Sequence, residues 1–311
     1  MAGWGLLTAV LAVADVTLTP SSDRIRIEID GRLFSEYVYR GAAKPYLYPI
    51  CAADGTPLTR GYPQENLPGE EHDHPHQHSL WFAHGSVDGR DFWREIPKTG
   101  AIVHDALLEA TSGAAGIIRT RNRWMLPEGT QVCTEERKIR VQPVPGGCLL
   151  DFEVTLQAGA QPLVMGDSSE GAMAIRLVQW MCQPHQFEKK DVAGAGHAVN
   201  SEGQRDAAAW GQRAAWVDCF APHNGGIYGV ALFDHPRNPR HPPWWHVRDY
   251  GLLSANPFGE YDFAKKPAPP GSAFTIPAGG SATFRYRFYF HSGDTAAAGV
   301  AGQFSEYAAE P

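Results

Sequence analysis

The chain has 311 residues, of which 43% are hydrophobic and 20% charged, a balance typical of a folded globular protein with a sizeable core. Its formal net charge of -7 argues against a nucleic-acid partner, because no basic face is available to displace counterions. The 33 glycines and 24 prolines favour many short strands joined by turns. The five cysteines show no CxxC spacing, and we expect them to be buried small apolar side chains.

Residues 5–14 form a short apolar run that ends in Ala12-Val13-Ala14. This pattern resembles the apolar region and cleavage site of an export signal, although no positive charge precedes it. We therefore predict a signal peptide at residues 1–14, one β-sandwich domain at 15–311, and a secreted or periplasmic protein. The alternatives are a first β-strand in this run and a cytoplasmic protein. The run is too short to span a bilayer, so no membrane insertion is expected.

Alternation of polar and apolar residues predicts β-strands along most of the chain. Residues 24–29 alternate without exception and pair with 33–39 through the turn at Gly31, whereas the prolines around 46–49 predict a sheet edge. Further strands are expected at 80–83, 102–109, 115–125, 131–141, 148–156, 170–177, 214–220, 226–233 and 281–290. Residues 188–208 are expected to form a loop excursion, and Asp294 to cap a C-terminal helix that runs to Tyr307. The predicted fold class is all-β: a large antiparallel β-sandwich with a short C-terminal helix.

Residues 72–84 concentrate five of the 13 histidines, at positions 72, 74, 76, 78 and 84. Folding alone gives no reason to gather imidazoles, because each buried ring needs a hydrogen-bond partner and close pairs disfavour each other's charged form. Histidine also titrates nearest to neutral pH. We interpret the stretch as the rim of an active site, with His74, His76 and His84 as candidate acids or bases. A solvated loop without function is the alternative.

A second dense stretch, residues 234–250, contains three more histidines, three arginines and a tryptophan pair. The tripeptide Asp-His-Pro occurs in it at 234–236 and in the first stretch at 73–75. We predict that the two stretches, although distant in sequence, converge on one cleft. His235 and His246 are then candidate proton donors.

Tryptophans beside charged groups suit a carbohydrate, because indole faces stack on sugar C–H groups while Arg, Asp, Asn and His bind hydroxyls. Trp81 fits either a stacking face or the core. Since neighbours on an extended backbone point to opposite sides, one of Trp244 and Trp245 is expected to be core and the other exposed. The candidate substrate-binding residues are Trp81, Arg237, His241, Trp244, Trp245, Arg248, Asp249 and Tyr250.

Glu170 lies where a turn meets a strand and is a candidate general acid or base. Arg176, at the other end of that strand, is a candidate for neutralising a carboxylate or an enolate-like oxygen; a Glu–Arg pair bracing the sheet is the alternative. A divalent metal is a further hypothesis. His74, His76 and His78 alternate, so an extended backbone would place all three on one face, although Pro75 favours a loop.

The motifs Asp73-His-Pro-His76, Leu80 through Gly85, Glu170-Gly171, Ala174-Ile-Arg176 and Phe233 through Gly251 resemble a bacterial family labelled "methane oxygenase PmoA-like". The resemblance covers most of the chain. Its label implies methane oxidation, but the membrane subunit of that enzyme needs several spans, and no stretch after residue 14 approaches transmembrane length. The resemblance better implies a β-sandwich similar to the galactose-mutarotase-like supersandwich, a fold that includes epimerases, glycoside hydrolases and polysaccharide lyases.

The predicted function is cleavage of a carbohydrate by acid–base chemistry. In an elimination, His74, His76, His84 or Glu170 removes a proton, Arg176 or a metal steadies the negative charge, and His235 or His246 protonates the leaving oxygen. In a hydrolysis, Glu170 is the acid or base, with Asp234 and Asp249 as candidate partners. The alternatives are a non-catalytic glycan-binding module and a metal-dependent oxygenase.

Overall fold

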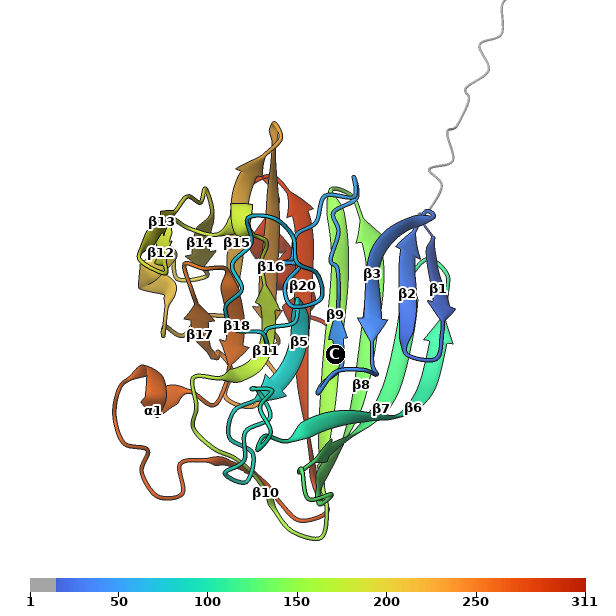
Figure 1. Cartoon of the computed structure of the whole chain (residues 1–311), viewed down its shortest axis with the longest axis vertical. Coiled ribbons are helices and arrows are strands. Elements are labelled where there is room, and N and C mark those ends of the chain that lie inside the picture. Colours follow the sequence, from blue (N-terminus) through green and yellow to red (C-terminus); the bar gives the residue numbers. More distant parts are fainter. Residues whose placement is uncertain (1–14) are drawn as a thin grey trace, which may run out of the picture.

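Two eight-stranded antiparallel sheets face each other in the computed structural model, which describes residues 15–311 (Figure 1). From edge to edge, the first sheet contains β1 (Val16–Pro20), β2 (Arg24–Ile29), β3 (Arg32–Val38), β4 (Tyr46–Leu47), β5 (Leu80–His84), β11 (Gly171–Arg176), β18 (Leu252–Asn256) and β17 (Trp244–Val247). The second contains β14 (His197–Asn200), β15 (Trp216–His223), β16 (Gly226–Asp234), β20 (Ser281–Ser292), β9 (Gly147–Ala158), β8 (Gln131–Val144), β7 (Gly116–Met125) and β6 (Ala101–Thr111).

Shorter elements connect these strands. Two small strand pairs are β10 (Leu163–Met165) with β19 (Phe274–Ile276) and β12 (His185–Phe187) with β13 (Lys190–Val192). The helical elements are η1 (Gln179–Met181), η2 (Asp206–Ala209), α1 (Glu260–Phe263) and α2 (Val300–Ala308). Within residues 15–311, no helix is long and apolar enough to cross a membrane. The predicted signal peptide lies outside the described residues, so export stays a prediction.

The core lies between the two sheets, where alternate residues of facing strands meet. Phe152 on β9 and Phe284 on β20 are buried in it, and the ring of Phe82 on β5 lies 6.3 Å, centre to centre, from the rings of Phe284 and of Trp124 on β7. The predicted large antiparallel β-sandwich with a C-terminal helix is thereby confirmed. All five cysteines are buried and unpaired, as expected.

Three local predictions were wrong. Residues 46–49 do not form a sheet edge, because β4 pairs with β3 on one side and β5 on the other. Asp294 accepts hydrogen bonds from Ala296 and Ala297 in a turn, and α2 begins only after Gly299. Residues 188–208 contain strands: β14 forms the edge of the second sheet.

Candidate active site

The outer face of the first sheet, turned away from the core, is defined by strand register. Trp81 on β5 pairs with Ala174 on β11, which pairs with Ser254 on β18, which pairs with His246 on β17. Because neighbouring residues in a strand face opposite sides, and Phe82 faces the second sheet, this row faces outward. His246 therefore lies on the outer face of the sheet that also carries the end of the first histidine stretch.

Residues 72–79, the part of the first histidine stretch that precedes β5, form a loop that we call the histidine loop. Buried ion pairs fix this loop on the outer face, where it crosses in front of the sheet (Figure 1). Arg176 donates from Nη2 to Asp73 Oδ1 at 2.8 Å and from Nη1 to Gln77 Oε1 at 2.6 Å. Arg60 pairs with the same Asp73 carboxylate and donates to the carbonyl oxygen of His74 at 3.3 Å. Burial raises the pKa of Asp73, but its hydrogen bond with His74 and the charges of the two arginines outweigh burial and hold that pKa well below its usual range. Asp73 is therefore an ionised anchor for the loop.

His74 is oriented by this anchor. Its Nδ1 is hydrogen-bonded to Asp73 Oδ2, and its ring stacks on Tyr250 with 5.2 Å between ring centres and 15° between planes. The guanidinium carbon of Arg176 lies 4.4 Å from the centre of the same tyrosine ring. The His74 backbone has a φ of 42°, a left-handed conformation that non-glycine residues adopt mainly where the surroundings enforce it, often at functional sites. With Nδ1 occupied and the side chain 41% exposed, Nε2 is placed to accept a proton.

Glu170 is a largely buried carboxyl without a partner. Among residues 15–311 its side chain has no hydrogen bond or ion pair, although its backbone is fixed by Ser168 Oγ at 3.1 Å and by the Gly85 amide at 2.7 Å. Burial raises the pKa of Glu170, an effect that the nearby charges of Arg94 and His74 oppose. A carboxyl that stays protonated to higher pH is suited to donate a proton.

Two neutral imidazoles complete the site. His246 donates from Nδ1 to the Ser169 carbonyl oxygen at 3.1 Å, which leaves Nε2 as an acceptor, and burial lowers its pKa to about 4. The His76 ring centre lies 5.7 Å from that of His74, and burial lowers the pKa of His76 to about 3. We refer to His74, His76, Glu170, His246 and Tyr250 as the His74–Glu170 site.

The other histidines of the first stretch lie elsewhere. His84 shares the inner side of β5 with Phe82, is fully buried, and hydrogen-bonds through Nε2 to the Gly166 carbonyl oxygen at 2.7 Å, so the structure does not place it as an acid or base. His78 stacks on Tyr46 and contacts Glu95 at 2.9 Å. The three alternating histidines thus do not share a face, because the loop turns at Pro75. In the described part of the chain, no group of three or more His, Cys, Asp or Glu side chains is placed to hold a metal ion.

Only the last part of the second stretch, from His246 to Tyr250, reaches the His74–Glu170 site. Asp234 ends β16 in the second sheet and is hydrogen-bonded to His241 at 2.6 Å. The His235 ring packs against Tyr307 of α2 at 5.0 Å between centres, and Arg237 follows in the same connection. The predicted convergence is therefore wrong for His235, Arg237 and His241, and Asp234 cannot serve as a second carboxylate at Glu170.

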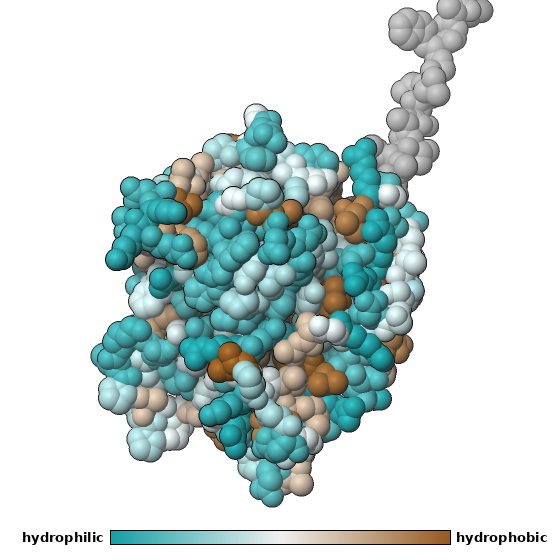
Figure 2. Space-filling view, in the orientation of Figure 1, coloured by the Kyte–Doolittle hydropathy of each residue, from teal (hydrophilic) through white to brown (hydrophobic). Residues whose placement is uncertain are grey.

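The tryptophans contribute less to this surface than predicted. Trp81 is fully buried beside Trp93, and Trp245 is fully buried with its Nε1 donating to the Ala214 carbonyl oxygen at 2.8 Å. Trp244 is half-buried and not exposed as predicted, although Trp245 is core. Tyr250 belongs to the site, and the rings of Phe263 and Trp210 lie 5.7 Å and 6.4 Å from that of His246. The molecular face seen in Figure 2 is predominantly hydrophilic.

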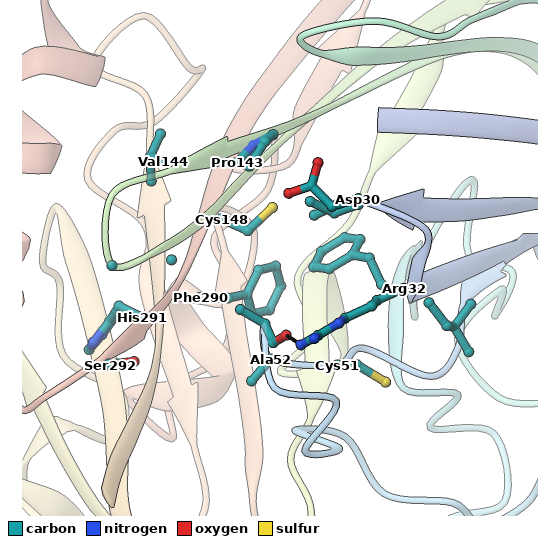
Figure 3. Close-up of a pocket in the computed structure, with 16 residues that line it drawn as sticks. Asp30, Arg32, Cys51, Ala52, Pro143, Val144, Cys148, Phe290, His291 and Ser292 are labelled. Atoms are coloured by element: carbon teal, nitrogen blue, oxygen red, sulfur yellow. Dashed lines mark hydrogen bonds between the residues drawn. The ribbon is translucent and has the colours of Figure 1, made fainter. Parts of the chain in front are cut away.

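A separate cavity of about 520 Å³ opens where the β2–β3 and β8–β9 turns approach each other (Figure 3). Its lining includes Phe34, Cys51, Cys148 and Phe290 and shares no residue with the His74–Glu170 site. His291 belongs to the lining, but its ring is hydrogen-bonded to Asp218 at 3.0 Å on β15. The candidate acid–base residues thus lie on the outer face of the first sheet and not in this cavity.

Fold and site together define an all-β sandwich protein with an acid–base cluster on one sheet. A family model matches residues 24–305, and the chain accordingly belongs to DUF6807, a family of unknown function. This match corrects the predicted membership of a PmoA-like family. A comparison with curated proteins found no match.

Solved structures with a related chain path were also found. A galactose mutarotase-like protein from Lactobacillus casei matches with 10% identity and a TM-score of 0.41, covering 89% of this chain and 100% of that one. A putative aldose 1-epimerase from Escherichia coli K12 matches with 10% identity, a TM-score of 0.34, and coverages of 89% and 98%. A glycoside hydrolase family 97 enzyme from Pseudoalteromonas sp. strain K8, in complex with panose, matches with 10% identity and a TM-score of 0.35. The match covers 89% of this chain and 34% of that one. At these values, what those proteins bind or catalyse does not transfer to this chain.

Proposed function

We propose that the protein is a carbohydrate-active enzyme that cleaves its substrate by acid–base elimination. The observation that carries this proposal is the unpaired, largely buried carboxyl of Glu170, which lies close enough to the Asp73-bound His74 for that ring's charge to act on it. A base and an acid placed near each other are the arrangement that proton removal at one atom and proton delivery at another require.

The roles follow from these surroundings. Nε2 of His74 takes a proton from a carbon next to a carbonyl or carboxylate, and Asp73 stabilises the resulting imidazolium. The electrons of the broken C–H bond form a C=C bond, the bond from the adjacent carbon to the leaving oxygen breaks, and Glu170 protonates that oxygen. Arg176 is only 1% exposed, and its Nη1 and Nη2 donate to Gln77 and Asp73, so its role is to position His74.

Elimination is favoured over hydrolysis because hydrolysis with two carboxylates needs a partner for Glu170. Asp234 lies in the other sheet, and Asp249 is exposed with its carboxylate bound to the Tyr250 amide at 3.0 Å. The carboxylates whose charges act on Glu170, those of Asp91 and Asp262, each accept a backbone N–H at 2.7 Å. A carbohydrate is favoured as substrate because the half-buried Trp210 ring lies beside His246 and other groups that hydrogen-bond hydroxyls, whereas the Tyr250 ring is already covered by His74 and Arg176.

The test is a screen of purified full-length protein against plant and algal oligosaccharides, including 3-keto and uronic-acid forms. Elimination is followed by the ultraviolet absorbance of a conjugated unsaturated product, and hydrolysis by new reducing ends without that absorbance. We expect the Glu170→Gln and His74→Asn variants to lose activity by at least about 100-fold, the range for a general acid or base.

His72→Asn is the matched control, because His72 belongs to the same loop but is exposed and stacks on Tyr62 with 4.4 Å between ring centres. It should retain wild-type activity. Binding without turnover that is insensitive to His74→Asn would instead identify a glycan-binding module. New reducing ends without unsaturation would replace elimination by hydrolysis.

A further inference from the structure

The cations beneath the His74–Glu170 site are matched by acidic groups. Arg60 and Arg176 pair with Asp73, and the buried Lys44 pairs with Glu95 at 2.6 Å. The positive charge of these three residues is therefore largely compensated within the protein and contributes little to binding a substrate.

Arg248 differs from these cations. It is exposed, and within residues 15–311 its guanidinium has no hydrogen bond or ion pair with an acidic side chain. Its guanidinium carbon lies 5.4 Å from the centre of the Tyr250 ring, the ring on which His74 stacks at 5.2 Å. Arg248 also lies close enough to His246 for its charge to lower that pKa, after the larger effect of burial. A free positive charge thus lies beside both imidazoles.

The acidic groups around Arg248 and Glu170 are already bound to backbone amides. Asp91, whose charge acts on Glu170, accepts the Trp93 N–H at 2.7 Å. Asp249 accepts the Tyr250 N–H at 3.0 Å, and Asp262 accepts the Ser169 N–H at 2.7 Å. Their negative charge is therefore partly compensated within the protein, and the Arg248 guanidinium stays available to a ligand.

We propose that the substrate is an acidic sugar, a uronate, whose carboxylate is bound by Arg248. This inference rests on the proposed function and adds the substrate class to it. A carboxylate next to the reacting carbon acidifies the C–H bond from which His74 takes the proton, and the guanidinium stabilises the negative charge that develops on the carboxylate oxygens. The remaining electrons and protons move as described for the elimination, so no oxidant or other co-reactant is needed.

Binding is tested by calorimetry in the Glu170→Gln background, so that an acid–base reaction does not consume the ligand. The probes are trigalacturonate and trimannuronate, each compared with its methyl ester, which has the same backbone without the charge. We expect one acid to bind more tightly than its ester, and Arg248→Gln to weaken binding of that acid by about 10- to 100-fold, the loss of one charge-assisted hydrogen bond. Arg248→Lys should retain part of the preference.

Arg213→Gln is the matched control, because Arg213 is also exposed and also lies against an aromatic ring, Trp244 at 4.7 Å, but donates to the backbone of Pro242. It should leave the preference unchanged. The inference is overturned if no acid binds more tightly than its ester, including the case of no binding at all, or if the preference survives Arg248→Gln. Turnover of neutral sugars only would overturn the substrate class and leave acid–base catalysis intact.

Discussion

Replacement of Asp73 by Asn tests whether the histidine loop depends on one buried charge. In the wild type, this carboxylate compensates both Arg60 and Arg176, each 1% exposed. Asparagine keeps the shape and one acceptor, but it leaves the buried Arg60 without its paired carboxylate and leaves Arg176 only the more distant Glu71, at 3.9 Å. Removing one partner of a buried ion pair costs about 3–5 kcal/mol, which is more than a 100-fold change in the ratio of folded to unfolded protein.

The measurement is urea unfolding of both proteins between pH 3 and pH 7. The folded-state pKa of Asp73 lies below its unfolded value, so the carboxylate stabilises the fold above about pH 4, the ordinary aspartate value, and this contribution is lost as pH falls through the depressed pKa. We therefore expect the difference between wild type and Asp73→Asn to be full at pH 7 and to shrink as the pH falls.

Asp105→Asn is the control, because Asp105 also contacts two arginines, Arg121 at 2.6 Å and Arg123 at 3.3 Å, but on the solvent-exposed side of β6. Solvent and salt screen that pair, so its loss should shift the midpoint far less. The reasoning about a buried anchor is refuted if Asp73→Asn shifts the unfolding midpoint no more than Asp105→Asn does.

Three further variants probe burial elsewhere. Because burial raises the pKa of Glu170, ionisation of this carboxyl destabilises the fold as pH rises above the ordinary glutamate pKa. Glu170→Gln should therefore raise the melting temperature relative to wild type at pH 8 but not at pH 4. An equal effect at both pH values would contradict the raised pKa. His84→Leu leaves the Gly166 carbonyl oxygen unpaired and should cost about 1–3 kcal/mol in urea unfolding, with unchanged turnover of any substrate that is found; lost turnover in a folded variant would return His84 to the active site. Arg137→Met strips the buried Glu135 of its cation, 2.7 Å away, and should cost about 3–5 kcal/mol; a loss under 1 kcal/mol in the same assay would show that Glu135 is satisfied without it.

The sandwich was predictable because burial alternates with a period of two along much of β7, β8 and β9. On β9, Leu150, Phe152 and Val154 are fully buried or nearly so, while Asp151 and Glu153 between them are not. The pattern does not encode strand order, since order depends on which strand pairs across the chain. This is why residues 46–49 read as an edge although β4 lies inside the first sheet.

For the site, the alternation of side chains along a strand already predicted which residues of β5 face the core. His84 is two residues from Phe82 on a short apolar strand, which already places both on one side, whereas Trp81 faces the other. The orientation of His74 had no such local signal. It depends on Arg60 and Arg176, which reach Asp73 from outside the histidine stretch.

The two Asp-His-Pro copies show that the surrounding residues set the pKa of the aspartate. Burial raises the pKa of both aspartates, yet that of Asp73 ends well below its usual range and that of Asp234 above it. The difference arises because two arginines face Asp73, whereas Asp234 is bound by Asn238 at 2.7 Å and by His241 at 2.6 Å, neither a permanent cation. The same tripeptide therefore yields an ionised anchor for a histidine in a loop over the first sheet and a buried hydrogen-bonded contact at the end of β16 in the second. Asp-His-Pro becomes a candidate dyad only where distant residues supply the positive charge.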